Sequence, residues 1–186
     1  MIFSSDNGGT PQGDNGPLRG NKASTWEGGV RVCAMAWWPG KIAPGSTCNE
    51  MAATFDVLPT VVPLAGGNVD GDRVIDGKDI RPLLFGAPGA KTPHEALYFF
   101  KQGAGELEAV RSGPWKYRLN EKSLYNLDKD LGEKTDVAGA NPEVIQRILP
   151  LVQKMDADLG VNKAGPGCRP AARVESPRPL LKPAKD

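Results

Sequence analysis

The pattern of apolar runs and Gly- or Pro-rich stretches divides the first third of the chain into short elements separated by loops. Residues 2–5, Ile-Phe-Ser-Ser, have the composition of the end of a buried strand. A long polar loop follows over 8–29, and residues 30–38 then form a nearly continuous apolar run that ends at Pro39-Gly40. Because strands covered on both faces carry such runs, we predict a buried strand over 30–38.

A helical pattern begins at Asp56, a residue type that favours the N-cap position. Gly66 stands where a glycine commonly ends a helix, and Pro63 predicts that the helix is short or kinked. Residues 67–93 have the composition of a further loop. The apolar positions of the predicted helix share one face: Leu58, Val61, Val62 and Ala65.

The remaining chain carries a strand pattern first and a helical pattern afterwards. Asn141-Pro142-Glu143 is a strong helix start, and apolar residues then recur at helical spacing as far as Leu159. The last 24 residues hold five prolines and six basic groups against two acidic ones, so we predict a disordered tail over 163–186. Short links between four segments predict an antiparallel meander: 96–100, 108–112, 115–119 and 123–127.

Composition narrows the possible classes of protein. With 23 Gly and 17 Pro among 186 residues, the chain is too rich in backbone breakers for a coiled coil or a plain helical bundle, which favours a loop-rich α/β or α+β fold. The formal net charge of +1 argues against a nucleic-acid-binding protein, which would carry a basic excess. No apolar run is long enough to predict a membrane span.

Cysteine and histidine give little support for catalysis or zinc binding within this sequence. Cys33, Cys48 and Cys168 form an odd set without a C-x-x-C pair, so one disulfide with a spare thiol and three buried reduced thiols both remain open. His94 is the only histidine, and its loop position predicts an incidental surface group. Residues 68–79 follow a calcium-loop pattern only in part, which predicts a polar surface loop.

Two sites carry candidate chemistry. Asp6-Asn7 stands at a strand end before two glycines, and its carboxylate and amide oxygens are hard ligands that suit Ca²⁺ or Mg²⁺. Lys22 lies in a Gly-rich loop and could hold a sulfate or phosphate group, although the spacing excludes a phosphate-binding P-loop. An ordinary Asn-Gly turn and an ordinary surface lysine remain open alternatives.

Six sequence elements, in register over about residues 2–160, resemble the carboxy-terminal part of a sulfatase, particularly of the arylsulfatase A type. They are Phe-Ser-Ser-Asp-Asn-Gly-Gly (3–9), Leu-Arg-Gly-Asn-Lys-Ala-Ser-Thr-Trp-Glu-Gly-Gly-Val-Arg-Val (18–32), Trp-Trp-Pro-Gly-Lys-Ile (37–42), Asp-Val-Leu-Pro-Thr (56–60) with Leu-Ala-Gly (64–66), Ile-Asp-Gly-Lys-Asp-Ile (75–80) and Leu-Tyr-Asn-Leu-Asp-Lys-Asp-Leu-Gly-Glu (124–133). Their order and spacing match those of the family.

The resemblance implies an α/β fold of the alkaline-phosphatase-like type, of which this sequence would be the carboxy-terminal portion. Residues 1–93 would form the end of the catalytic α/β domain, and 94–162 a small subdomain with an antiparallel sheet and a helix. By the same resemblance, Asp6 and Asn7 are two ligands of a Ca²⁺ ion (Mg²⁺ in some members), and Lys22 binds the sulfate ester.

The sequence also departs from the family pattern. Sulfatases use a formylglycine nucleophile made from a C/S-x-P-S-R motif, which does not occur here. The upstream Asp-Asp metal ligands and the other sulfate-contacting residues are absent too, and Cys33 replaces a proline that relatives usually carry. We therefore expect Met1 to be the first residue of a truncated gene, an internal start or the beginning of a partial sequence, with the nucleophile in a missing amino-terminal half.

The expected function is that of a sulfatase segment, inactive by itself, acting within an enzyme on a small-molecule, glycan or lipid sulfate ester. Two alternatives remain open: a phosphodiesterase or phosphonate hydrolase of the same superfamily, and a non-catalytic remnant or binding module. Relatives are commonly secreted, periplasmic or lysosomal, but this sequence contains no targeting segment that would select a compartment.

Overall fold

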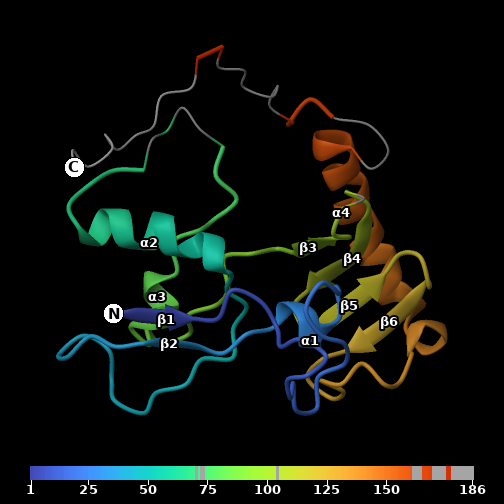
Figure 1. The fold of residues 1–186 in the computed structure, drawn as a ribbon, viewed down its shortest axis with the longest axis horizontal. Helices are drawn as coiled ribbons and strands as arrows, with labels where there is room; N and C mark the ends of the chain where they lie inside the picture. Colours follow the sequence, from blue (N-terminus) through green and yellow to red (C-terminus); the bar gives the residue numbers. More distant parts are fainter. Residues whose placement is uncertain (70, 72–73, 104, 161–164, 169–174, 177–186) are drawn as a thin grey trace, which may run out of the picture.

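The computed structural model of the chain describes residues 1–69, 71, 74–103, 105–160, 165–168 and 175–176. Helices and strands form a mixed α/β arrangement whose two parts lie side by side (Figure 1). In chain order the elements are β1 (Ile2–Ser4), α1 (Glu27–Val30), β2 (Ala34–Ala36), α2 (Val57–Leu64), α3 (Arg81–Leu84), β3 (Leu97–Phe100), β4 (Leu107–Ser112), β5 (Trp115–Arg118), β6 (Ser123–Asn126) and α4 (Pro142–Leu159), with 3-10 turns at Thr54–Asp56 and Ala138–Ala140.

The predicted meander is confirmed as an antiparallel sheet in the order β3-β4-β5-β6. Strands β4 and β5 join through a two-residue loop, and Ser112 pairs with Trp115 across it. Gly113 begins that loop at a φ of +56°, a backbone region that glycine enters without steric cost. The turn chemistry therefore fixes the register of the two central strands.

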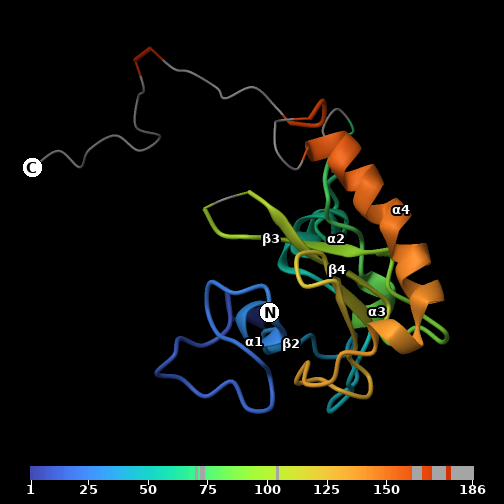
Figure 2. The same cartoon turned by 90° about the vertical axis from the view of Figure 1, so that its right-hand side faces the viewer.

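Helix α4 lies along one face of this sheet, and α1 with its flanking loop lies on the opposite face (Figure 2). The predicted helix start at Pro142 is confirmed, and the helix runs through Pro150 to Leu159. Its side chains at spacing i and i+4 enter the core between helix and sheet. The buried cluster consists of Leu107, Val110, Tyr117, Leu124, Val144 and Ile148.

The first part of the molecule contains β1, β2, α2 and α3. Its two strands are shorter and more exposed than predicted. Strand β1 pairs antiparallel with β2, and Phe3 and Met35, which lie opposite each other, are 51% and 64% exposed. The prediction of a buried strand over 30–38 is wrong, because Val30 ends the α1 turn and β2 begins only at Ala34. An apolar run does not show how many of its residues pair with a neighbouring strand. Here the neighbouring strand β1 has three residues, and β2 pairs with it over three residues.

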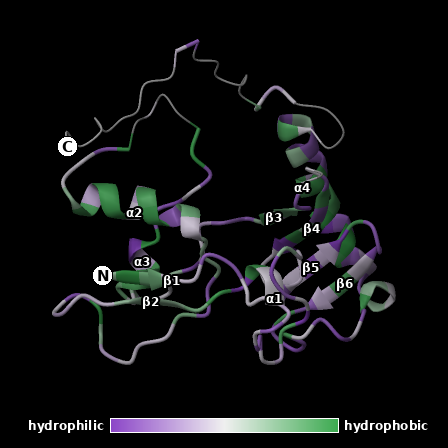
Figure 3. Ribbon diagram, in the orientation of Figure 1, coloured by the Kyte–Doolittle hydropathy of each residue, from purple (hydrophilic) through white to green (hydrophobic). Residues whose placement is uncertain are grey.

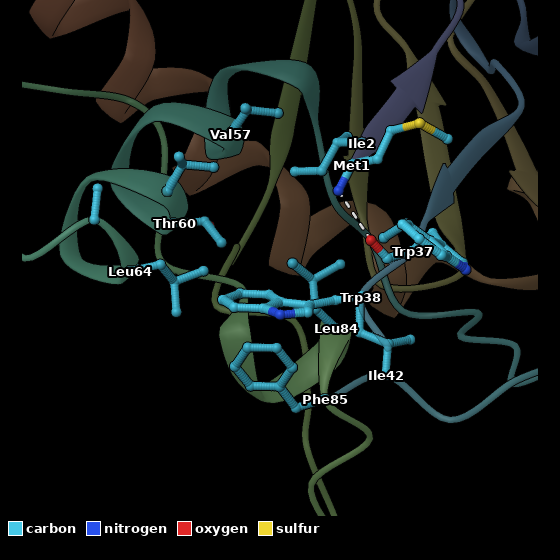
Figure 4. A pocket seen from close by; sticks show the side chains of 13 residues that line it. Met1, Ile2, Trp37, Trp38, Ile42, Val57, Thr60, Leu64, Leu84 and Phe85 are labelled. Carbon is cyan, nitrogen blue, oxygen red and sulfur yellow. Dashed lines mark hydrogen bonds between the residues drawn. The ribbon is translucent and has the colours of Figure 1, made fainter. Parts of the chain in front are cut away.

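Several large apolar side chains of β1, β2 and α2 are exposed. The ribbon of β1 and of much of α2 is coloured as hydrophobic in Figure 3. A pocket of about 450 Å³ opens between these elements and α3 (Figure 4). Trp38 and Phe85 pack edge to face in its wall, with ring centroids 6.0 Å apart. Among the described residues before His94, the buried apolar side chains are Met51, Pro59 and Leu83, so this part has little core of its own.

Helix α2 agrees with the prediction from the sequence. It ends at Leu64, and Gly66 follows at a φ of +79°, as expected for a glycine that terminates a helix. Helix α3 lies within the stretch 67–93 that was predicted to be a loop. A helix of four residues is too short for its apolar positions to repeat, so the pattern carried no signal for it.

The sequence predicted that the side chain of Asp56 caps α2, but it makes no capping hydrogen bond. The carboxylate instead joins three segments of the chain. It accepts hydrogen bonds from the backbone N–H groups of Ala53 and Lys78, each at 2.8 Å. The Nε2 atom of His94 lies 2.8 and 2.9 Å from the two carboxylate oxygens. The prediction of an incidental surface histidine is therefore wrong, since His94 is buried against a carboxylate that is itself fully buried.

Replacing Asp56 with alanine is expected to lower the free energy of unfolding by about 2–4 kcal/mol, because it leaves buried hydrogen-bond donors without an acceptor. The measurement is chemical denaturation followed by circular dichroism. The exposed Asp128 provides the matched control, and Asp128→Ala should change the free energy of unfolding by less than about 0.5 kcal/mol. Equal effects of the two substitutions would contradict the role given to Asp56.

Candidate functional site

The loop between β1 and α1 brings the three predicted site residues to one region of the molecule. The N–H of Lys22 donates to the carbonyl of Gly9 at 2.8 Å, which joins the lysine segment to the turn that follows Asp6 and Asn7. A second bond, from the Gly8 N–H to the Gly29 carbonyl at 3.0 Å, holds that turn against α1. Residues 13 and 21 positions apart in the chain are thus brought together by backbone contacts.

Asn15, which no sequence motif singled out, holds this loop closed. Its side-chain Oδ1 accepts from the N–H of Gly9 at 2.8 Å. Its Nδ2 donates to the carbonyls of Gly20 at 3.1 Å and Gly9 at 3.3 Å. One amide side chain therefore joins both sides of the loop that carries the candidate site.

The close approach of backbones explains the glycine content of the loop. A Cβ atom at Gly8 would overlap the carbonyl oxygen of Gly28, and one at Gly28 would overlap the carbonyl oxygen of Gly20. Only glycine allows main chains to pack at this separation. The glycines thus position the turn at Asp6-Asn7 against the segment that carries Lys22.

The turn at Asp6 and Asn7 carries hard oxygen donors. Asp6 is exposed, Asn7 is half-buried, and Asp6 Oδ1 accepts from the N–H of Asn7 at 3.0 Å. A carboxylate and an amide oxygen suit Ca²⁺ or Mg²⁺, so this donor set fits the ion that the sequence predicts. Among the residues that the structure describes, no group of three or more His, Cys, Asp or Glu could hold a metal, so other ligands would have to complete the coordination.

Lys22 presents an exposed side chain from a tightly turned backbone. The next residue, Ala23, has a φ of +74°, a strained conformation for a residue with a side chain. Ser24 closes this turn, because both its N–H and its Oγ donate to the carbonyl of Asn21, at 3.0 and 2.7 Å. The backbone beneath the ammonium group is therefore well defined.

A cluster of buried charges lies directly after the lysine segment. The Nζ atom of Lys116, on β5, is 2.8 Å from Glu27 Oε1 and 3.1 Å from Glu133 Oε1. Glu133 Oε2 also accepts the backbone N–H of Glu27 at 2.7 Å. The three side chains are at most 1% exposed, while Arg31 and Arg111 each lie 3.6 Å from Glu27 Oε2.

Trp26 lies between two guanidinium groups. Arg19 and Arg118 lie 3.6 and 3.7 Å from its ring centroid, and Tyr125 packs against its edge at 5.7 Å. Arg118 also donates to Thr25 Oγ1 at 3.0 Å. Stacking of Trp26, as well as the ion pairs of Glu27, therefore holds the segment before α1 against the sheet.

The remaining sequence candidates lie outside this site. Cys33, Cys48 and Cys168 are free, but all three are exposed, so the expectation that reduced thiols would be buried is wrong. No helix among the described residues is long and apolar enough to cross a membrane. Most of the predicted tail over 163–186 and part of the loop at 68–79 fall outside the described residues.

Comparison with known proteins points to one family. A family model described as Sulfatase matches residues 1–67. Human arylsulfatase A is 36% identical over 196 residues, covering 86% of this chain and 38% of that protein. Rat steryl-sulfatase is 48% identical over 94 residues, covering 50% of this chain and 16% of that protein.

A solved structure shows the same arrangement of elements. The crystal structure of Ps i-CgsB in complex with k-i-k-neocarrahexaose superposes with a TM-score of 0.76 at 28% identity, over 88% of this chain and 38% of that one. The chain thus spans less than two fifths of the length of these three proteins.

The buried cluster predicts a measurable pH dependence of stability. Burial raises the pKa of Glu133 above its ordinary value of 4.5, and the Lys116 ammonium offsets only part of this effect. The folded chain therefore binds this proton more tightly than the unfolded chain does. The stabilisation from this group is present in full below about pH 4.5 and is lost as the pH rises through the folded pKa.

The test compares the wild-type chain with Glu133→Gln by chemical denaturation between about pH 4 and pH 7. The difference in free energy of unfolding, wild type minus variant, is expected to fall as the pH rises. Carboxylates remote from Glu133 and Lys116 titrate in both proteins and cancel in this difference. A difference that stays constant or grows with pH would contradict the raised pKa.

Proposed function

Because the chain belongs to the sulfatase family and resembles arylsulfatase A, we propose that it is the carboxy-terminal segment of an enzyme that hydrolyses sulfate esters. In this proposal residues 1–93 complete the catalytic α/β domain, and 94–162 form a carboxy-terminal subdomain. The observation that supports the proposal most is the hydrogen bond from the backbone N–H of Lys22 to the carbonyl of Gly9, which joins the lysine segment to the turn that follows Asp6 and Asn7.

Lys22 is proposed to bind the sulfate group of the substrate. Its ammonium offers three donors and is exposed on a strained, internally bonded turn, so it could meet an anionic ester with little reorganisation of the backbone. Held in place, it would stabilise the negative charge that develops as the ester bond breaks. Sulfate esters of small molecules, glycans or lipids all present such a group.

Asp6 and Asn7 are proposed as two ligands of a Ca²⁺ ion, with Mg²⁺ as the alternative. When bound, the ion would polarise the sulfuryl oxygens and neutralise part of their charge. The family chemistry also needs a formylglycine nucleophile, and residues 1–186 contain no C/S-x-P-S-R motif from which it could form. The nucleophile and the remaining ligands are proposed to come from polypeptide outside this sequence.

The 186-residue chain alone is expected neither to hydrolyse aryl sulfates nor to bind Ca²⁺ more tightly than a Kd of about 1 mM, since two ligand residues are few for an ion that takes 6–8 oxygens. Turnover is measured with a chromogenic aryl sulfate, and binding by titration calorimetry. Ca²⁺-dependent turnover in a preparation free of host sulfatases would contradict the proposal that the nucleophile lies outside the chain.

The role of Lys22 is testable in a chimera in which this chain replaces the matched region of human arylsulfatase A. Lys22→Met is expected to lower kcat for an aryl sulfate by about 10²–10³, the usual loss for one preorganised donor. The exposed Lys41 is the matched control, and Lys41→Met should leave kcat unchanged. A change below about threefold for Lys22→Met would remove this lysine from the site, since a preorganised donor contributes far more.

A further inference from the structure

We propose that one face of the carboxy-terminal sheet holds the loop that carries Lys22 in its working position, with Lys116 as the central positioning residue. We name residues 19–28 the Lys22 loop. The docking face consists of Glu108, Lys116, Arg118 and Glu133. The inference rests on the proposed role of Lys22, but the contacts that carry it are independent of that role.

Both ends of the Lys22 loop attach to the same face. At the first end, the guanidinium of Arg19 donates to the carbonyl of Glu133 at 3.0 Å and stacks on Trp26. At the second end, Lys116 Nζ donates to Glu27 Oε1 at 2.8 Å. The backbone N–H of Glu27 donates to Glu133 Oε2 at 2.7 Å. Lys22 therefore lies on a loop whose two ends are fixed to one rigid support.

The loop is also closed on itself. The N–H of Gly28 donates to the carbonyl of Arg19 at 2.7 Å, so residues 19–28 form a ring. Three consecutive side chains, beginning with Thr25, leave this ring toward the docking face. Thr25 Oγ1 donates to Glu108 at 2.6 Å and accepts from Arg118 at 3.0 Å. A movement of the loop would have to break the contacts of all three side chains together.

Lys116 is central because it is the ammonium shared by two buried carboxylates, Glu27 from the loop and Glu133 from the docking face. Without Lys116 the two buried carboxylates lose the ammonium between them, and Glu27 keeps only Arg31 and Arg111 at 3.6 Å from its Oε2. Such loss of one partner of a buried ion pair is strongly unfavourable. With Lys116 absent, Glu27 is expected to leave the docking face for solvent. The loop would then open at its second end while the core under α4 stays intact, because Lys116 lies on the opposite face of β5 from Tyr117.

The test is amide hydrogen exchange of the 186-residue chain. In wild type, the amides of Lys22 and Gly28 are expected to be protected, since both donate to backbone carbonyls. Arg19→Met and Lys116→Met should each lower their protection by about 10- to 100-fold, the scale of one or two lost hydrogen bonds. Core amides such as Val110 and Leu124 should change by less than about threefold, because unlinked sites open independently.

Two further variants make the comparison specific. Lys116→Arg keeps the positive charge and should restore part of the protection. Lys101→Met removes an exposed lysine beyond the end of β3 and should change nothing. Arg19→Met leaves no buried charge behind, so it decides the result if Lys116→Met unfolds the sheet. The proposal is overturned if the Lys22 amide is as well protected in Arg19→Met as in wild type. It is also overturned if the Lys22 amide loses protection only when the Val110 amide does.

A double-mutant cycle in the arylsulfatase A chimera tests whether Lys116 acts through Lys22. Lys116→Met should lower kcat in the otherwise native chimera and have no further effect when Lys22 is already methionine. Additive losses would show that Lys116 affects turnover by another route and would overturn the proposal. A different result would be that the Lys116 variant loosens the loop in hydrogen exchange while Lys22→Met leaves kcat unchanged. That result would refute the proposed function but would still support the contact between the loop and the docking face.

Discussion

The ion pair between Glu27 and Lys116 connects the two parts of this molecule. A buried ammonium needs partners to compensate the loss of water, and here they come from residues 89 and 17 positions away in the chain. This requirement fixes how the loop that follows β1 sits on β5. Because the same loop carries Lys22 and packs against the Asp6-Asn7 turn, the geometry of the candidate site depends on a contact made outside it.

The two parts differ in how they are stabilised. The sheet β3–β6 and helix α4 enclose an apolar core, so their fold follows from ordinary burial of hydrophobic side chains. The part built from β1, β2 and α2 leaves many of its large apolar side chains exposed, and its buried contacts include polar ones such as Asp56 with His94. Polar contacts are directional, which makes them suited to holding loops whose glycines bring backbones into close contact.

Membership of the sulfatase family gives these features a chemical context. A divalent ion and a lysine act on the same sulfate group only if their positions are fixed to within a fraction of an ångström. In the proposed site that precision would come from backbone hydrogen bonds, from Asn15 and from the docking face, none of which belongs to the proposed catalytic set. The small sheet is thus better understood as a support for the site than as a separate appendage.

The sequence by itself determined the elements whose signal is local or periodic: the meander, helix α4, helix α2 with its terminating glycine, and the family motifs that contain Asp6, Asn7 and Lys22. It could not show that Lys116 is buried, because alternation along β5 places that residue on the face away from the core, where solvent is the usual neighbour. The same holds for His94, whose carboxylate partner is 38 residues away. Burial of a charge depends on what the rest of the chain brings to it, and only the tertiary structure decides that.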